Sequence, residues 1–340
     1  MAIDPIFEGT GIGQGVNFDT FGCDVFEATP PTPDRLTPNV SFHLGVRFGL
    51  KLRTPDFREI EVWRFDWEDR PRTDAWPSPT LRVRQGQVVH VRMHQRNNTH
   101  TIHFHGIEPT TFNDGVGHTS FEVSGEYTYQ FQANEAGTFF YHCHKNTNLH
   151  LEMGMYGFLI VDPPQGPGAV FEGGPRYDVE KLWAVDDLDP VWRSLGHDAG
   201  LCGEDAGLNL FNPKYFAISG AFAPNAMTDP RAVVRARAGQ RILVRLVNTS
   251  YSILRTTLGV DATVVSVDGR GLGRPGAPWS RSFTIPANQP FELTSAQRYD
   301  LILTPPAAGT YSAHFEFLHW ITRAVQDNGR GIANTRIIVT

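Results

Sequence analysis

An all-β protein of two domains is expected from three features of this sequence. The chain has 340 residues, which is enough for two domains of ordinary size. It contains 33 glycines and 24 prolines, a content that favours turn-rich β-structure over helices. Polar and apolar residues alternate in several short runs, and such alternation is the pattern of half-buried strands.

The composition narrows the class of protein. Hydrophobic residues make up 40% and charged residues 19% of the chain, so it can bury a substantial core. The net charge is −6 and there is no long basic run, which argues against nucleic acid or an anionic membrane as a partner. No stretch is long and apolar enough to span a bilayer.

The cellular compartment is left open by the sequence. The first residues lack the basic and apolar regions of a signal peptide, so we expect a cytoplasmic protein or an exported one whose leader has been removed. Cys23 and Cys202 can form one disulfide if the protein is exported. We expect them to be free thiols, because nothing in the sequence brings them together.

The first predicted domain covers residues 41–162. Residues 1–40 before it are rich in Gly, Pro and Thr without periodicity, so they are interpreted as an N-terminal arm. Alternating residues then predict strands at 41–48, 58–67, 81–83, 88–93 and 126–131.

The second predicted domain covers residues 177–340. The segment 163–176 before it is dense in Pro and Gly, which is typical of a linker. Residues 309–316, Gly-Thr-Tyr-Ser-Ala-His-Phe-Glu, line up with residues 137–144, Gly-Thr-Phe-Phe-Tyr-His-Cys-His. The two domains are therefore expected to be weak internal repeats of one fold.

Two short windows of the first domain concentrate residues that bind metals. Six of the 13 histidines lie in them. A lone thiolate, two imidazoles and a weak axial thioether form the trigonal site of a blue-copper centre. Cys143, His150 and Met155 supply most of that set, and the fourth ligand is predicted to be His100. A structural zinc site would more often show paired cysteines, which this chain lacks.

Histidine pairs predict further metal close to Cys143. In a strand, residues two apart point to the same face, so His142 and His144 point together and away from Cys143. His103 and His105 form a second pair of this kind. Two such pairs on adjacent strands would hold metal a few covalent bonds from the thiolate, which is a short route for an electron.

These motifs resemble the copper-binding cupredoxin domain of multicopper oxidases. The pattern His-x-x-His-x-His-Gly, then His-Cys-His, then His-x4-Met carries the likeness, and the second half resembles the middle domain of three-domain members. The resemblance implies two tandem cupredoxin-like Greek-key β-sandwich domains, the second without type 1 copper. It implies a type 1 copper held by His100, Cys143, His150 and Met155. It further implies type 2 and/or type 3 copper held by His103, His105, His142 and His144.

The second domain keeps little of this copper-binding pattern. Thr256-Thr-Leu258 stands where the family carries His-x-His, and His314 alone remains of the His-Cys-His motif, with His319 and Glu316 as candidate helpers. A full cluster in this family takes histidines from two domains. We therefore expect a homotrimer in which a neighbour's second domain supplies His314 or His319 to an interdomain copper site, because a cyclic arrangement closes on itself. A reduced cluster and completion by a different protein are the alternatives.

The predicted function is that of a laccase-like copper oxidase. A reducing substrate, a phenol, aromatic amine or metal ion, would lose single electrons at the type 1 copper, and dioxygen would be reduced at the type 2/type 3 site. A nitrite-reductase-like enzyme with one type 2 copper is the first alternative, although those enzymes carry Asp at the position of His103. A copper electron-transfer or copper-sequestering protein without oxidase turnover is the second alternative.

Overall fold

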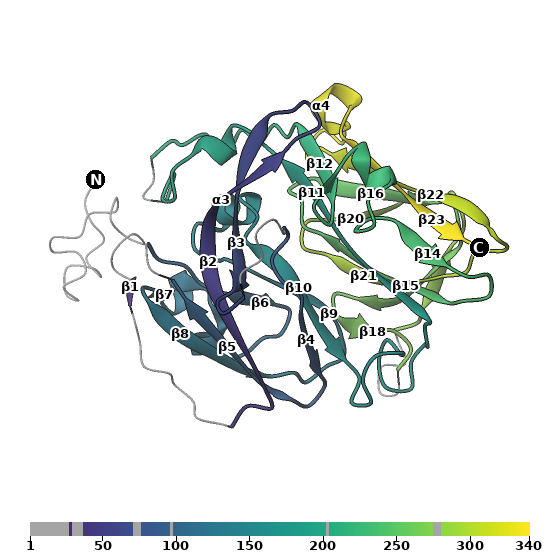
Figure 1. Ribbon diagram of the computed structural model, residues 1–340, viewed down its shortest axis with the longest axis horizontal. Coiled ribbons are helices and arrows are strands. Elements are labelled where there is room, and N and C mark those ends of the chain that lie inside the picture. The colour runs from purple at the N-terminus through teal and green to yellow at the C-terminus, as the bar shows by residue number, and fades with distance from the viewer. Residues whose placement is uncertain (1–26, 29–36, 71–75, 96–97, 202–203, 275–279) are drawn as a thin grey trace.

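The computed structural model describes residues 27–28, 37–70, 76–95, 98–201, 204–274 and 280–340. Across these residues strands dominate and the helices are short, which confirms the all-β prediction. The N-terminal half, purple to teal, lies beside the C-terminal half, green to yellow (Figure 1). Cys23, Cys202 and most of the predicted arm fall outside the described residues. None of the described helices has the length and apolar character needed to cross a membrane.

Two four-stranded sheets form the N-terminal half, in the orders β3-β2-β5-β8 and β4-β10-β9-β6. Their strands are β2 (Val40–Arg53), β3 (Glu59–Trp67), β4 (Leu81–Arg84), β5 (Val88–His94), β6 (His103–His105), β8 (Glu126–Gln132), β9 (Gly137–His142) and β10 (Tyr156–Asp162). The short strands β1 (Glu27–Ala28) and β7 (Glu122–Val123) pair with each other. Every second residue of β5 is buried, as its alternating sequence predicts. Phe65, Val91, Phe104 and Leu159 meet in the core of this half.

The C-terminal half has two larger sheets. One has the order β13-β12-β11-β15-β21-β17-β18, with β19 paired to β17, and the other has the order β14-β23-β22-β16-β20. Their strands are β11 (Val179–Leu188), β12 (Tyr215–Ile218), β13 (Ala221–Phe222), β14 (Val234–Ala236), β15 (Ile242–Asn248), β16 (Ile253–Leu258), β17 (Ala262–Val267), β18 (Arg270–Gly271), β19 (Phe283–Ile285), β20 (Phe291–Leu293), β21 (Arg298–Leu303), β22 (Gly309–Leu318) and β23 (Ile332–Val339). Trp183, Leu246, Phe315 and Phe317 fill the core of this half.

Short helices connect some of the strands. They are α2 (Thr111–Asp114), α3 (Thr147–Glu152) and α4 (Gln326–Gly329), with the 3-10 turns η1 (Gly117–Thr119), η2 (Trp192–Ser194) and η3 (Asn225–Met227). The helix α3 and the turn η2 lie in contact with each other although they belong to different halves of the chain.

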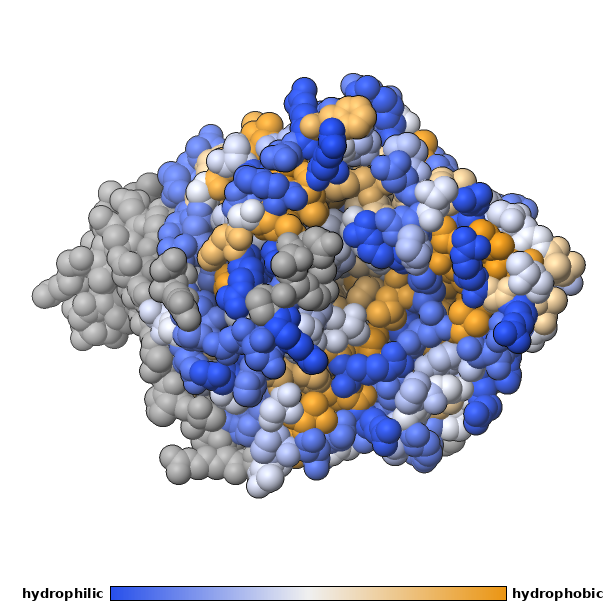
Figure 2. Space-filling model, in the orientation of Figure 1, coloured by the Kyte–Doolittle hydropathy of each residue, from blue (hydrophilic) through white to orange (hydrophobic). Residues whose placement is uncertain are grey.

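An apolar contact joins the two halves. Phe140 of β9 and Phe158 of β10 share a buried cluster with Ala217 of β12 and Val247 of β15. Hydrophobic side chains also show in patches across the middle of the face in Figure 2, where hydrophilic side chains cover much of the rest. The contact is close at Gly137, because a Cβ there would lie 2.2 Å from the carbonyl oxygen of Gly269.

The segment 163–176 also packs against the protein. Val170 and Phe171 are buried in a small cluster with Leu243 and Val265 of the C-terminal half. This segment is therefore fixed to the sheets of the C-terminal half.

Candidate metal centre

Strand β9 ends at His142 and continues directly into Cys143 and His144. Successive side chains of an extended chain point to opposite faces. The thiol of Cys143 therefore faces one group of histidines, while the rings of His142 and His144 stack on the other side with centroids 5.7 Å apart.

The first group surrounds the thiol of Cys143. Its Sγ lies 3.6 Å from Nδ1 of His100 and 3.3 Å from Nδ1 of His150. A β-bridge to Val123 positions His100, and helix α3 positions His150. Cys143, His100 and His150 are each 0% exposed. One sulfur and two imidazole nitrogens thus converge in a dry site, and this donor set suits copper.

Met155 lies next to Cys143 through the backbone. The N–H of Cys143 donates to the carbonyl oxygen of Met155 at 3.0 Å, and the N–H of Met155 donates to the carbonyl oxygen of His150 at 3.1 Å. The first bond continues the ladder between β9 and β10 by one step. Met155 is fully buried in the same core cluster as Cys143, so the predicted axial thioether is in a place where water is excluded.

Burial sets the protonation of the first group. Removal from water lowers the pKa of His150 to about 3, and it lowers the pKa of His100 well below its usual range. Burial also raises the pKa of the Cys143 thiol to about 11. Near neutral pH the two imidazoles therefore offer free lone pairs, whereas the thiol has to lose its proton when a metal binds.

The second group brings together the other four predicted histidines. The ring centroid of His103 lies 5.2 Å from that of His142 and 5.2 Å from that of His144. The ring centroid of His105 lies 5.7 Å from that of His142. One nitrogen from each of His103, His105 and His142 lies within 4.8 Å of the others, which is close enough for a shared metal ion.

Hydrogen bonds orient two of these rings. Nδ1 of His103 donates to the carbonyl oxygen of Asp114 at 2.7 Å, and Nδ1 of His142 donates to the carbonyl oxygen of Cys143 at 2.9 Å. Because a carbonyl oxygen only accepts, Nδ1 carries the proton in both rings and Nε2 keeps its lone pair for a metal. Gly115 allows the chain after α2 to lie against the backbone just before β6, because a Cβ at this position would lie 1.9 Å from the carbonyl oxygen of Ile102.

The two histidines predicted in the second half lie outside both groups. Among the described residues, neither His314 nor His319 is part of a possible metal group. Nδ1 of His314 donates to Oδ1 of Asn334 at 2.7 Å, which leaves a lone pair on Nε2. Nδ1 of His319 instead accepts from the N–H groups of Ile321 and Thr322, so its neutral ring is protonated at Nε2. His314 is therefore the better oriented of the two for a metal. Glu316 forms an ion pair with Arg255.

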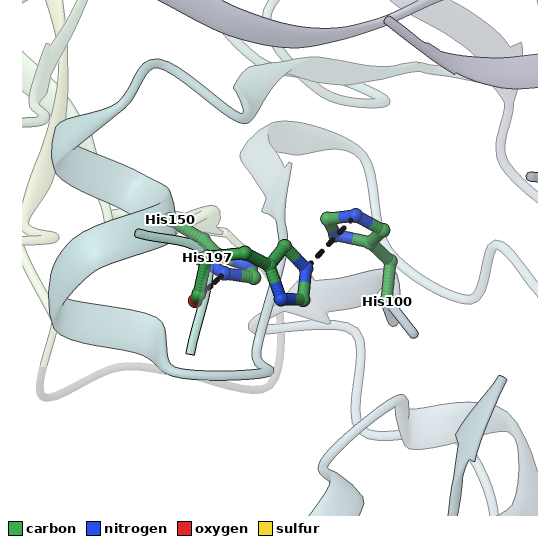
Figure 3. A group of neighbouring side chains, drawn as sticks. All are labelled: His100, His150 and His197. Carbon is green, nitrogen blue, oxygen red and sulfur yellow. Dashed lines mark hydrogen bonds between the residues drawn. The ribbon is translucent and has the colours of Figure 1, made fainter. Parts of the chain in front are cut away.

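The structure adds His197, which the sequence analysis missed. Its Nε2 lies 3.3 Å from Nε2 of His100, and its carbonyl oxygen lies 3.0 Å from Nε2 of His150 (Figure 3). His100, His150 and His197 also form a possible three-histidine metal group. No spacing motif marks His197, because it lies 47 residues from His150 and 97 residues from His100.

Comparison with known sequences identifies relatives. Residues 73–166 match the family model for multicopper oxidases. The multicopper oxidase MmcO of Mycobacterium tuberculosis is 28% identical over 295 residues, which are 75% of this chain and 52% of that protein. The chain thus spans about half or less of the length of such curated relatives.

Solved structures share the fold. The blue copper oxidase from Nitrosomonas europaea matches with a TM-score of 0.68 and 23% identity, covering 88% of this chain and 86% of that one. The copper nitrite reductase from the same organism matches with a TM-score of 0.63 and 18% identity, covering 89% and 94%. Residues 73–166 therefore belong to the multicopper oxidase family, and the described chain shares its fold with the blue copper oxidase and the copper nitrite reductase.

Proposed function

We propose that this chain is an oxidase that takes single electrons from a reducing substrate and passes them to dioxygen. The position of Cys143 between the two histidine groups is the observation that carries the proposal. Its Sγ faces His100 and His150, while its neighbours His142 and His144 belong to the second group. When bound, copper would supply one-electron redox chemistry at the first group and dioxygen chemistry at the second.

The chain's own residues have separate tasks in this proposal. The type 1 ligands would be His100, Cys143, His150 and Met155. The type 2 and/or type 3 ligands would be His103, His105, His142 and His144. The peptide bonds on either side of Cys143 join the two sites through a few covalent bonds. Phenols, aromatic amines and metal ions in a low oxidation state are the proposed substrates, in line with the family.

We propose in addition that a homotrimer completes the second site. His103 is 17% exposed at its side chain, so this group lies near the surface. The C-terminal half of the same chain adds no histidine to it among the described residues. A neighbouring subunit would supply His314, whose Nε2 lone pair is left available by the hydrogen bond from Nδ1 to Asn334. Such a heterologous contact closes into a ring.

Copper content, visible absorption, EPR and oxygen uptake together test the function. Intense blue absorption, more than one copper per chain and oxygen consumption with a phenol or ferrous ion are expected. Cys143→Ser should remove the blue band, whereas His43→Ala, at an exposed position of β2, should keep it. A blue protein that consumes no oxygen would instead be an electron-transfer protein. One that reduces nitrite, which its fold also allows, would overturn the oxidase proposal.

Complementation between two variants tests the shared site. His103→Ala and His314→Ala are each expected to lose oxygen reduction. If the site lies between subunits, coexpressed and copurified mixed trimers regain intact sites, from the first half of one variant and the second half of the other. Mixed assemblies without oxygen reduction, or a monomer with full copper, would contradict the trimer.

A further inference from the structure

The segment between β11 and β12 extends from the C-terminal half onto the first histidine group. Arg193 of η2 donates to the carbonyl oxygen of Glu152, at the end of α3. Nδ2 of Asn146, just before α3, donates to the carbonyl oxygens of His197 and Ala199 at 3.3 and 2.9 Å. The segment is therefore held on both ends of the helix that carries the ligand His150.

His197 lies over the outer edges of two ligand rings. Figure 3 shows its ring between those of His100 and His150. It stacks on Trp63, with ring centroids 5.9 Å apart, and Trp63 also contacts His150 edge-on at 5.4 Å. The side chain of His197 is 10% exposed, whereas His100 and His150 are 0% exposed. His197 thus separates both ligand rings from solvent.

The contact with the backbone of His197 determines which ring nitrogen of His150 carries the proton. Nε2 of His150 lies 3.0 Å from the carbonyl oxygen of His197, which can only accept. Nε2 therefore carries the proton. The lone pair of His150 is left on Nδ1, which is the atom 3.3 Å from Sγ of Cys143.

Two successive hydrogen bonds determine which ring nitrogen of His100 carries the proton. Nδ1 of His197 donates to Oδ1 of Asp198 at 2.7 Å, so Nε2 of His197 is the acceptor. Nε2 of His100 donates to it at 3.3 Å. The lone pair of His100 is then left on Nδ1, 3.6 Å from Sγ of Cys143.

These bonds decide between two uses of the three histidines. A metal ion held by His100, His150 and His197 through their outer nitrogens would have to displace both contacts to His197. A metal at the inner nitrogens displaces neither of them, and it also gains the thiolate of Cys143. The hydrogen-bond pattern therefore makes His197 a partner of the ligands and not a ligand itself.

We propose that His197 is a positioning residue of the type 1 copper site. It holds the rings of His100 and His150 by their Nε2 atoms, so that both Nδ1 atoms face Cys143, and it closes the outer edge of the site to small molecules. This inference rests on the proposed function in taking the metal to be copper. The orientation of the two rings is a property of the metal-free protein.

Imidazole nitrogen NMR of the metal-free protein tests the orientation. In the wild type, the His100 and His150 rings should both show the tautomer protonated at Nε2. His197→Phe keeps a stacked ring but offers no acceptor, so His100 should become a mixture of tautomers while His150, which bonds to the backbone, stays unchanged. His197→Gln restores an acceptor and should restore His100. An unchanged His100 signal in His197→Phe would overturn the proposal.

Copper binding gives the second readout. His197→Phe should bind the type 1 copper about 10- to 100-fold more weakly, as is typical when the hydrogen-bond partner of a ligand is removed, with His197→Gln closer to wild type and His43→Ala unchanged. Added imidazole should alter the EPR spectrum of His197→Ala but not that of the wild type. If His197→Phe abolishes a copper equivalent that Cys143→Ser retains, His197 is a ligand and the proposal is wrong. If no variant binds copper at Cys143, the proposed function fails, while the NMR result still decides the role of His197.

Discussion

Arg245 of β15 donates a hydrogen bond of 2.9 Å to the hydroxyl of Thr138 in β9, across the contact between the two halves. Arg245 is 0% exposed and forms ion pairs with Glu180 at 2.7 Å and with Asp300 at 3.5 Å. The strand that ends in His142 is therefore attached to the C-terminal half by a buried, charged network as well as by apolar contacts.

Removal of this guanidinium should be strongly destabilising. Arg245→Met leaves the buried Asp300 without its counter-charge, whereas Glu180 keeps Arg82 at 2.6 Å. Breaking a buried pair in this way costs about 3–5 kcal/mol of unfolding free energy. Arg323→Met is the control, because Arg323 is 43% exposed and pairs with Glu292 at the surface, where a pair contributes less than about 1 kcal/mol. Urea denaturation measures both, and equal losses would show that the network contributes little.

Copper binding should release about one proton per type 1 site near neutral pH. Burial raises the pKa of the Cys143 thiol to about 11, so this thiol is protonated before the metal arrives. The pKa of His150 is about 3, and burial also keeps His100 neutral, so neither imidazole contributes a proton. Calorimetry in buffers of different ionisation enthalpy counts the protons. Cys143→Ser should release none at this site, and a similar release from that variant would assign the proton to another group.

Asp187 should make the protein less stable as the pH rises. Burial raises its pKa from an ordinary value of 3.8 to about 7. Between these values the folded protein holds a proton that the unfolded chain has lost, so stability is present below the window and is lost as the pH rises through it. Asp187→Asn removes this dependence.

The Asp187→Asn variant should therefore gain stability relative to wild type as the pH increases from about 4 to about 7. Thermal unfolding across this range measures the difference. Glu172→Gln, at an exposed position, should differ from the wild type by a constant amount. A parallel pair of curves for Asp187→Asn would mean that Asp187 does not titrate in this window.

Loss of metal from the second histidine group should leave the copper of the first group in place. His103→Ala removes a ring whose centroid lies 5.2 Å from those of both His142 and His144, whereas the proposed type 1 ligands belong to the other group. The blue absorption is expected to persist, while the copper beyond the first equivalent and the oxygen uptake are lost. Metal analysis and EPR measure this. His94→Ala is the control, because it removes a ring that pairs with Glu68 and should leave both sites intact. Loss of the blue band in His103→Ala would contradict the existence of two separate sites.

The strands could be predicted from the sequence because polar and apolar residues alternate where a strand has one exposed and one buried face. The patterns at 81–83 and 88–93 correspond to β4 and β5. Nothing in their residues indicates that these neighbours belong to different sheets, because sheet membership depends on pairing with β10 for one and with β2 and β8 for the other. The domain limits at 162 and 177 stay a prediction.

The site was predictable where its residues are close in sequence. His142, Cys143 and His144 are consecutive, so a strand geometry already separates the thiol from the two imidazoles. His197 could not be found in this way, because its place next to His100 depends on how the segment after β11 crosses between the halves. The roles proposed for His314 and His319 depend on packing between subunits, which the sequence of one chain does not encode locally.

The three consecutive residues at the end of β9 fix the separation of the two proposed metal sites by bond lengths and bond angles. The segment that carries His197 is held to α3 by hydrogen bonds, which can lengthen or break, whereas the peptide bonds on either side of Cys143 keep their length. The covalent path between the two proposed sites therefore keeps a constant length. The residues around each site can be changed without altering that length. Changes in the loop from Asn146 to Met155, or in the segment that covers it, can alter the acceptance of electrons without altering the distance over which they travel.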